Sequence, residues 1–289
     1  MTLLLFALCC LGLVGLPYVP ALAEWLRGTD ALALPIAEAY HETHVALPQQ
    51  VRHDLLTPDG ARHATSARLE TDAGASVSVV AAGDDLVLGA GTTVAEHAHA
   101  GAHLRVGPGC TLRGSASSDG AAAVSAGTRF ERLHAPALFL GGPHAPKPRW
   151  VAQRQFAPAA RRDASGRYVV SGDLDVPEGA VVGGTLIASG TVRLGAGAHV
   201  DGDVRAGGDL VLGDQATVVG HAFSDHSLTL ESHATVEGAA IARRRLALGA
   251  HARVGRHDRP ATATADIVEA SAGALVHGTL WARVRGHVG

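Results

Sequence analysis

The sequence predicts an all-β protein whose main body is a parallel β-helix, a three-sided solenoid with about 18 residues per coil. Two observations carry this prediction. Aliphatic or small residues recur every six positions over most of the chain, and residues of the same kind recur every 18 positions. A coil with one short strand on each of three sides produces both periods, because six residues make a side and 18 make a coil.

The clearest series lie in the C-terminal half, where we expect leucines and valines to form vertical stacks of buried side chains. Alternate residues of a strand point to the same side, so the polar residues between the rungs face water. A slip of one residue would turn every inward side chain outward, which explains the strict spacing. The predicted core ladder is Leu194, Val200, Leu212, Val218, Leu230, Val236, Leu248 and Val254.

The composition agrees with a narrow solenoid. Hydrophobic residues make up 47% of the chain but aromatic residues only 4%, because a thin tube has little room for rings. The 36 glycines argue against helices, where each would cost about 1 kcal/mol. Several glycines directly follow a rung, as Gly195 and Gly213 do, where the missing Cβ relieves crowding at a corner. The net charge of −3 gives no electrostatic case for nucleic acid as a partner.

The pattern divides the chain into five segments. Residues 1–23 carry no charged side chain and are long enough to cross a bilayer as a transmembrane helix. Residues 24–75 lack the six-residue period and are expected to form a juxtamembrane linker that caps the solenoid. Residues 76–136 form the first β-helix block, residues 137–167 a basic, proline-rich insertion, and residues 168–289 the second block. Whether the two blocks make one stack is left open.

The first segment has two interpretations. Arg27 follows the apolar stretch and no basic residue precedes it, which favours a retained anchor with the body in the cytoplasm. The small residues Ala21 and Ala23 before Glu24 also suit a signal peptide, cleaved near Ala23, that would export the body. A retained anchor makes membrane lipid a partner.

We assign no catalytic, cofactor-binding or metal-binding residue from the sequence. His97 and His99 share one face of a strand, but no further ligand lies nearby at a convincing spacing. The neighbours Ser224, Asp225 and His226 are the residue types of a catalytic triad, yet adjacency in sequence is not triad geometry. The chain is therefore predicted not to be an enzyme and to need no cofactor.

The six-residue pattern continues almost to the C-terminus, so we expect an open edge on the last coil. Unpaired backbone groups on a terminal coil, together with inward aliphatic side chains, can bind a second copy of the chain. The residues predicted to carry this self-association are Val77, Val79 and Leu86 at one end, and Leu275, Val276, Leu280 and Trp281 at the other.

Two families resemble this repeat. The hexads LGAGAH, LGDQAT, LESHAT and LGAHAR are similar to those of the hexapeptide-repeat acyltransferases, which form left-handed β-helices and act as trimers. Those enzymes carry a catalytic histidine on a loop, and no histidine here has a context that singles it out. The match concerns the fold element more than the activity, so an acyltransferase is the alternative function.

The strings VVGGTLIASGTV, VDGDVRAGGDLVL, VEGAAIARRRLAL and VHGTLWARV resemble the repeat of the bactofilins, a family of polymer-forming bacterial cytoskeletal proteins. This resemblance implies a right-handed coil, no cofactor, assembly through the solenoid ends and association with the bacterial inner membrane. It also implies cell-wall enzymes as partners, although no residue of this sequence identifies a particular one. Two blocks separated by a basic insertion depart from the single block usual in that family.

Overall fold

The computed structural model describes residues 62–142 and 154–289, apart from positions 66, 157, 159–160, 164 and 166. The predicted anchor at residues 1–23 and most of the predicted linker at 24–75 lie outside the described residues. Within the described residues, no helix is long and apolar enough to cross a membrane. All regular secondary structure in this part of the chain is β-strand.

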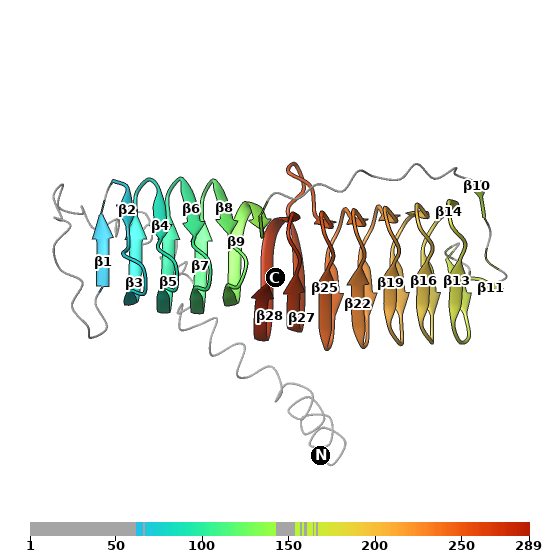
Figure 1. Ribbon diagram of the computed structural model, residues 1–289. Helices are drawn as coiled ribbons and strands as arrows, with labels where there is room; N and C mark the ends of the chain where they lie inside the picture. Colours follow the sequence, from blue (N-terminus) through green and yellow to red (C-terminus); the bar gives the residue numbers. More distant parts are fainter. Residues whose placement is uncertain are drawn as a thin grey trace, which may run out of the picture. The chain divides into compact units, whose positions relative to one another are not determined.

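The strands form a parallel β-solenoid of about 11 turns with about 18 residues per turn (Figure 1), which confirms the predicted β-helix. In the second block each turn holds three short strands, and each strand pairs with the strand three places later. Three parallel sheets therefore run along the solenoid, one on each side. The pairing of every turn with its neighbours satisfies the backbone N–H and C=O groups.

The first block consists of nine strands, and its longer strands bend around a corner to serve two sheets. It begins before the predicted start at residue 76 and continues beyond the predicted end at 136. The strands are β1 (Arg62–Thr65), β2 (Leu69–Glu70), β3 (Ser76–Ala82), β4 (Leu86–Leu88), β5 (Thr93–Ala100), β6 (His103–Val106), β7 (Thr111–Ser118), β8 (Ala121–Val124) and β9 (Arg129–Leu140).

The second block supplies the more regular turns. Its first sheet contains β12 (Tyr168–Val170), β15 (Leu186–Ala188), β18 (Val204–Ala206), β21 (Ala222–Ser224) and β24 (Ala240–Ala242). Its second sheet contains β13 (Leu174–Val176), β16 (Val192–Leu194), β19 (Leu210–Leu212), β22 (Ser227–Leu230) and β25 (Arg245–Leu248). Its third sheet contains β14 (Ala180–Gly183), β17 (His199–Asp201), β20 (Thr217–Val218), β23 (Thr235–Val236) and β26 (Arg253–Val254). Two long strands, β27 (Ala261–Ala270) and β28 (Ala274–Val288), bend around corners and complete the block.

Two short strands of the predicted insertion cover the start of the second block. β10 (Arg154–Gln155) pairs in parallel with β14. β11 (Arg161–Arg162) pairs antiparallel with β12. The insertion therefore contributes a cap to two of the three sheets at that end.

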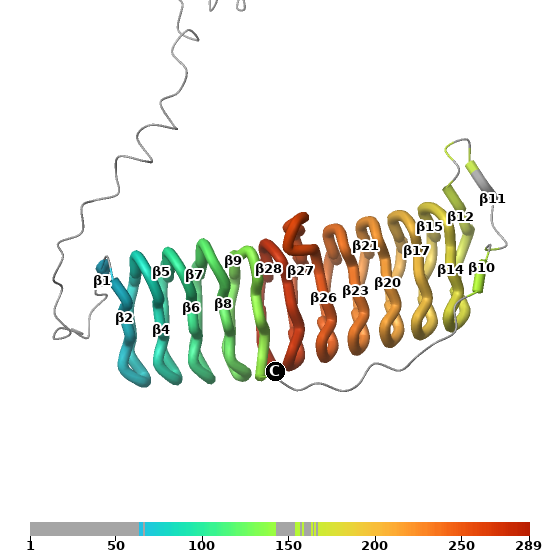
Figure 2. Tube along the Cα trace, turned by 90° about the horizontal axis from the view of Figure 1, so that it is seen from above, coloured from blue at the N-terminus to red at the C-terminus, as the bar shows by residue number. Residues whose placement is uncertain are grey.

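The two blocks run toward each other along one axis and meet at their C-terminal turns (Figure 2). β28 lies antiparallel to β9 on all three sides: residues 274–276 face 138–140, residues 278–281 face 132–135, and residues 286–287 face 129–130. We call this contact the junction. It makes the two blocks one continuous stack, and it places the last strand of the chain in the middle of the solenoid rather than at an end.

The core follows the predicted ladder. Leu194 lies beside Leu212, which lies beside Leu230, and Leu230 lies beside Leu248. The valines from Val200 to Val254 form a second stack of the same kind. All eight ladder side chains are at most 2% exposed. The leucine and valine series therefore form the vertical stacks that the 18-residue period predicted.

Candidate functional site

The four C-terminal residues predicted for self-association lie in the junction. Val276 and Leu280 are fully buried, and Leu280 lies directly opposite Leu133 of β9. Leu275 lies opposite Phe139, and Trp281 lies opposite Arg132. The expectation of an open edge on the last coil is therefore wrong, because that edge is paired with the first block of the same chain. The contact that these residues make here is intramolecular.

Polar contacts cross the junction on its surface. The Nδ1 atom of His134 lies 2.9 Å from Oγ1 of Thr279, and Nδ1 of His277 donates to the backbone carbonyl of Pro136 at 2.9 Å. The guanidinium of Arg132 stands 4.5 Å from the ring centroid of Trp281. These contacts, with buried leucines beneath them, fix the register of the two blocks.

The other predicted residues lie near the start of the first block. Val77 and Leu86 are buried, and Val79 is half-buried. They do not form the last described turn at that end, because β1 covers β3 and β2 covers β4. The terminal turn instead presents Leu69 of β2, which is partly buried against the core. Self-association through this end stays a prediction, but the contact surface would be formed by β1 and β2, one turn further out than the predicted residues.

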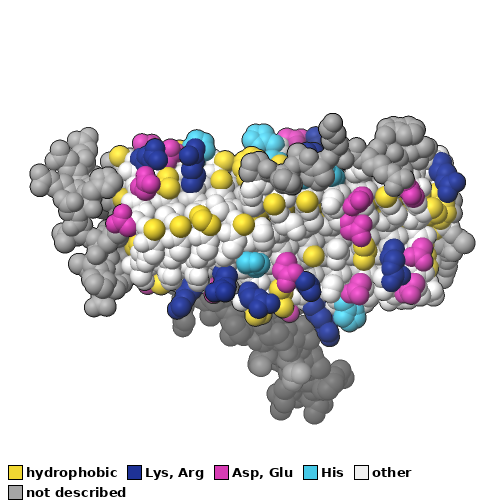
Figure 3. Space-filling view, viewed as in Figure 1, with side chains coloured by type: hydrophobic (Ala, Val, Ile, Leu, Met, Phe, Trp, Pro, Cys, Tyr) yellow, Lys and Arg dark blue, Asp and Glu magenta, His cyan; other side chains and the backbone are white. Residues whose placement is uncertain are grey.

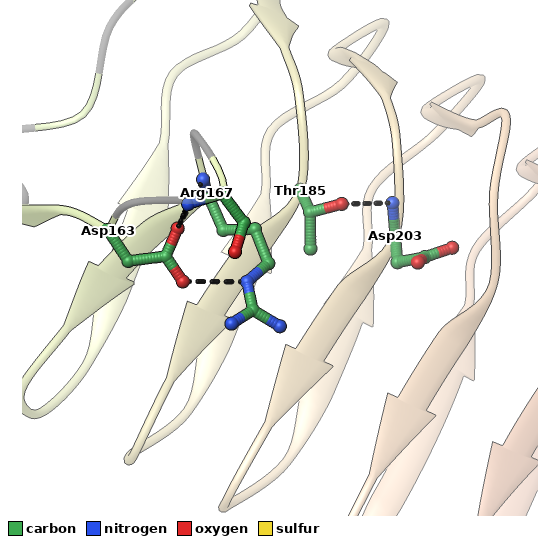
Figure 4. A network of polar contacts seen from close by, with 5 residues as sticks. Asp163, Arg167, Thr185 and Asp203 are labelled. Atoms are coloured by element: carbon green, nitrogen blue, oxygen red, sulfur yellow. Dashed lines mark hydrogen bonds and ion pairs between the residues drawn. The ribbon is translucent and has the colours of Figure 1, made fainter.

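Asp163 closes the turn between β11 and β12 at the start of the second block. Its carboxylate accepts hydrogen bonds from the backbone N–H groups of Ser165 and Arg167 at 2.9 and 3.0 Å, and from Nε of Arg167 at 2.7 Å (Figure 4). The hydrogen bonds from Arg167, its backbone N–H first, hold the pKa of this carboxyl below its usual value. Phe156, which follows β10, and Tyr168 of β12 pack partly buried against the core.

The histidines that the sequence singled out have ordinary partners. Nδ1 of His97 contacts Ser115 Oγ at 2.7 Å, and Nδ1 of His99 contacts Ser117 Oγ at 3.0 Å. The nearby His103, on β6, contacts the carboxylate of Asp85 at 3.0 Å. In the part of the chain that the structure describes, no group of three or more His, Cys, Asp and Glu side chains could hold a metal ion.

The Ser224 and Cys110 side chains serve the core. The Ser224 Oγ lies 2.8 and 2.9 Å from the backbone carbonyl oxygens of Gly208 and Ser227, which share its one donor proton, so it links two neighbouring turns. The Cys110 thiol is fully buried and donates to the carbonyl of Gly89 at 3.1 Å. Burial raises the pKa of this thiol, which keeps it in the unreactive protonated form.

One feature of the surface has no counterpart in the predicted sites. Arginines gather on the corner between the first and second sheets, close to the junction. The signal for them is visible in the sequence as the runs Arg243–Arg245 and Arg283–Arg285, which fall between rungs. What the sequence does not show is that these two runs lie on the same corner, separated by one turn.

A scan against models of protein families found no match, and searches among curated proteins and among solved structures found none either. The solenoid agrees with both resemblances drawn from the repeat, the bactofilins and the hexapeptide-repeat acyltransferases, and does not choose between them.

Proposed function

We propose that this chain is a structural scaffold of the bactofilin type, held at the inner face of a bacterial membrane by residues 1–23. Its solenoid body lies in the cytoplasm, turns in the right-handed sense that the bactofilin resemblance implies, and associates end to end with a second copy. It catalyses no reaction and needs no cofactor. Enzymes of the cell wall are the partners that a scaffold of this type would organise.

The observation that carries the proposal is the junction. Two solenoid ends of this chain pair with each other on all three sides, antiparallel and without a connecting loop at the contact. This intramolecular contact supports the proposal that a terminal turn can bind the terminal turn of a second copy. Unpaired backbone groups and the open core at the edge supply the driving force, as they do in any β-sheet extended by a further strand.

The two outer ends differ in how well they suit this contact. The start of the second block is covered by β10 and β11 on two of its three sheets. At the start of the first block, β1 and β2 are the outermost described strands, and Leu69 lies in this turn. We infer that association runs through the first-block end, and that pairs of chains form more readily than long filaments.

The test is the mass of the purified full-length chain in detergent, measured by light scattering, with negative-stain images of the same sample. Leu69→Lys places a charge on the terminal turn and should convert the assembly into single chains. Val87→Lys is the matched control, because Val87 faces outward on the side of β4, one turn in from the end. It should leave the assembly intact.

Several outcomes contradict the proposal. Single chains at all concentrations would reject end-to-end association. A sharp trimer that binds an acyl donor would instead support the acyltransferase. A mature N-terminus at Glu24 would show export after signal cleavage in place of a cytoplasmic body.

A further inference from the structure

Seven arginines lie together around the corner between the first and second sheets, on both sides of the junction. Four carboxylates lie among them: Glu131, Asp225, Asp266 and Glu269. The surface therefore carries an excess of positive charge, although the whole chain has a net charge of −3. We call it the arginine edge, and its members are Arg132, Arg205, Arg243, Arg244, Arg245, Arg283 and Arg285.

The edge stands out from the solenoid because of an irregularity in β28. On β28, the residues between Trp281 and Gly286 have only Glu131 opposite them on β9. The extra residues Arg283, Val284 and Arg285 bulge outward. Figure 3 shows arginine side chains, in dark blue, along the lower border of this face, over the strands around the junction.

The bulge is fixed in place rather than loose. Arg283 forms an ion pair with Asp266 at 3.0 Å, and its Nη2 donates to the backbone carbonyl of Arg243 at 2.6 Å. This side chain thus spans the turn formed by β27 and ties the two arginine runs together. Arg244 and Arg285 are exposed and have no ion-pair partner among the described residues.

Exposed apolar side chains lie at the same place. Val284 at the apex of the bulge is 70% exposed, and Trp281 just before it is 38% exposed. Phe223, Ile241 and Trp281 occupy aligned outward-facing positions on strands of the first sheet. Phe223 and Ile241 form the floor of a shallow cavity of about 340 Å³. The rim of this cavity is formed by Arg205, Arg243 and Arg283, together with Asp225, Ser224 and two alanines.

We propose that the arginine edge docks onto the surface of an anionic phospholipid bilayer. Guanidinium groups bind phosphate oxygens through several hydrogen bonds, and the rimmed cavity has room for one headgroup. The edge is a convex corner, so it fits a planar surface, and Val284 and Trp281 reach the interface where apolar and aromatic side chains are favoured. A nucleic acid would match the charge but would leave Val284 at the centre of the contact without an apolar partner.

This docking lays the solenoid axis along the membrane plane. The inference rests on the proposed function only in placing the chain at a membrane, because it concerns the solenoid and not residues 1–23. It assigns to the body a second contact with lipid, which an anchor alone does not require.

The experiment uses the fluorescence of Trp281 in the full-length chain. The chain has three tryptophans, so Trp25→Phe and Trp150→Phe leave Trp281 as the single reporter. The probe is a vesicle with bromine atoms on the lipid acyl chains, made of phosphatidylglycerol or of phosphatidylcholine. Trp281 should be quenched in the anionic vesicles and not in the neutral ones, and added salt should weaken the quenching.

The test variant is Arg244→Gln with Arg285→Gln, chosen because neither side chain has an ion-pair partner in the described structure. It should abolish quenching in anionic vesicles. The matched control is Arg193→Gln with Arg253→Gln, which removes the same charge from exposed positions outside the arginine edge, on β16 of the second sheet and β26 of the third. It should leave the quenching unchanged. Val284→Ser should weaken the quenching without changing the melting temperature.

The failures of the two proposals are distinguishable. A vesicle-bound chain with unquenched Trp281 overturns the docking and leaves the membrane location standing. Equal quenching in both lipids, or quenching that survives Arg244→Gln with Arg285→Gln, also overturns it. Quenching as expected from a chain that stays single in solution supports the docking and rejects the end-to-end scaffold.

Discussion

At the scale of single residues, one corner position repeats in a left-handed conformation. Gly179, Gly197 and Gly273 have φ of 66°, 64° and 80° there, and the same position carries Gln215, His233 and His251 at 60°, 58° and 57°. A small buried residue always follows, as Ala216 follows Gln215. The tight turn needed to bring that small residue inward is therefore imposed by the stack, even where the side chain does not favour it.

This corner gives a prediction for Gln215. Gln215→Val should lower the free energy of unfolding by about 1–2 kcal/mol, because a β-branched residue resists the left-handed region. Gln215→Gly should leave stability unchanged or raise it slightly. Thermal unfolding followed by circular dichroism measures both. Thr229→Val, in the extended strand β22, is the control and should not destabilise; a loss as large as that of Gln215→Val would contradict the explanation.

Residue identity predicted the inside of the solenoid better than its corners. The glycines after the rungs were correctly explained, since a Cβ on Gly195 would lie 2.5 Å from the backbone nitrogen of Glu178. The six-residue period predicts that polar residues between the rungs face water. Asp203 and Asp209 in fact each accept a backbone N–H from the residue 18 positions later. Such a bond depends on the distance between turns, which a single repeat does not reveal.

At the scale of elements, the junction is a contact between two strands far apart in sequence. The six-residue period predicted strands at both β9 and β28 but could not predict that they pair. The period determines only which side chains point inward. The same inward-pointing side chains can pack against the next turn of their own block or against the other block. The six-residue period does not predict the bulge at Arg283–Arg285 either. A bulge is an excess of residues relative to the paired strand, and the period does not reveal that β28 pairs with β9.

The strength of the junction can be measured by cutting the connection between the blocks. A protease site inserted between residues 143 and 153 should be cleaved without separating the fragments, because nine residue pairs and buried leucines hold β9 to β28. Size-exclusion chromatography should show one particle containing both pieces.

The control for this cut is Leu280→Arg, which places an unpaired charge in the buried contact with Leu133. After cleavage, that variant should elute as two separate fragments. Separation of the unaltered fragments would show that the junction depends on the covalent connection.

At the scale of the whole molecule, the solenoid has two N-terminal ends and a C-terminal centre. In a stack that contacts only nearest neighbours, turns at the ends open more readily than turns in the middle. The backbone N–H of Val288 donates to Thr128 at 2.9 Å within the central turns, whereas β12 lies in the first turn of its block. The position of a segment along the axis, and not its position in sequence, therefore sets its stability.

Hydrogen exchange followed by mass spectrometry tests this arrangement. Peptides covering β28 should exchange more slowly than peptides covering β12 or β1, although β28 contains the last residues of the sequence. Leu280→Arg serves as the control and should bring β28 up to the exchange rate of the ends. Rapid exchange at β28 in the unaltered chain would contradict a paired centre.

The placement of β28 also sets the order of events during synthesis. β9 emerges from the ribosome about 150 residues ahead of its partner, a delay of about 7–30 s at ordinary rates of translation. Throughout that interval the first block of a nascent chain exposes the unpaired edge of β9, because β28 has not yet been synthesised. Ribosomes that translate the same messenger RNA hold several such first blocks close together. Intramolecular pairing of β9 with β28 then competes with domain swapping, in which β9 of one chain pairs with β28 of another. Fast translation, or a chaperone that covers β9, favours the intramolecular pairing.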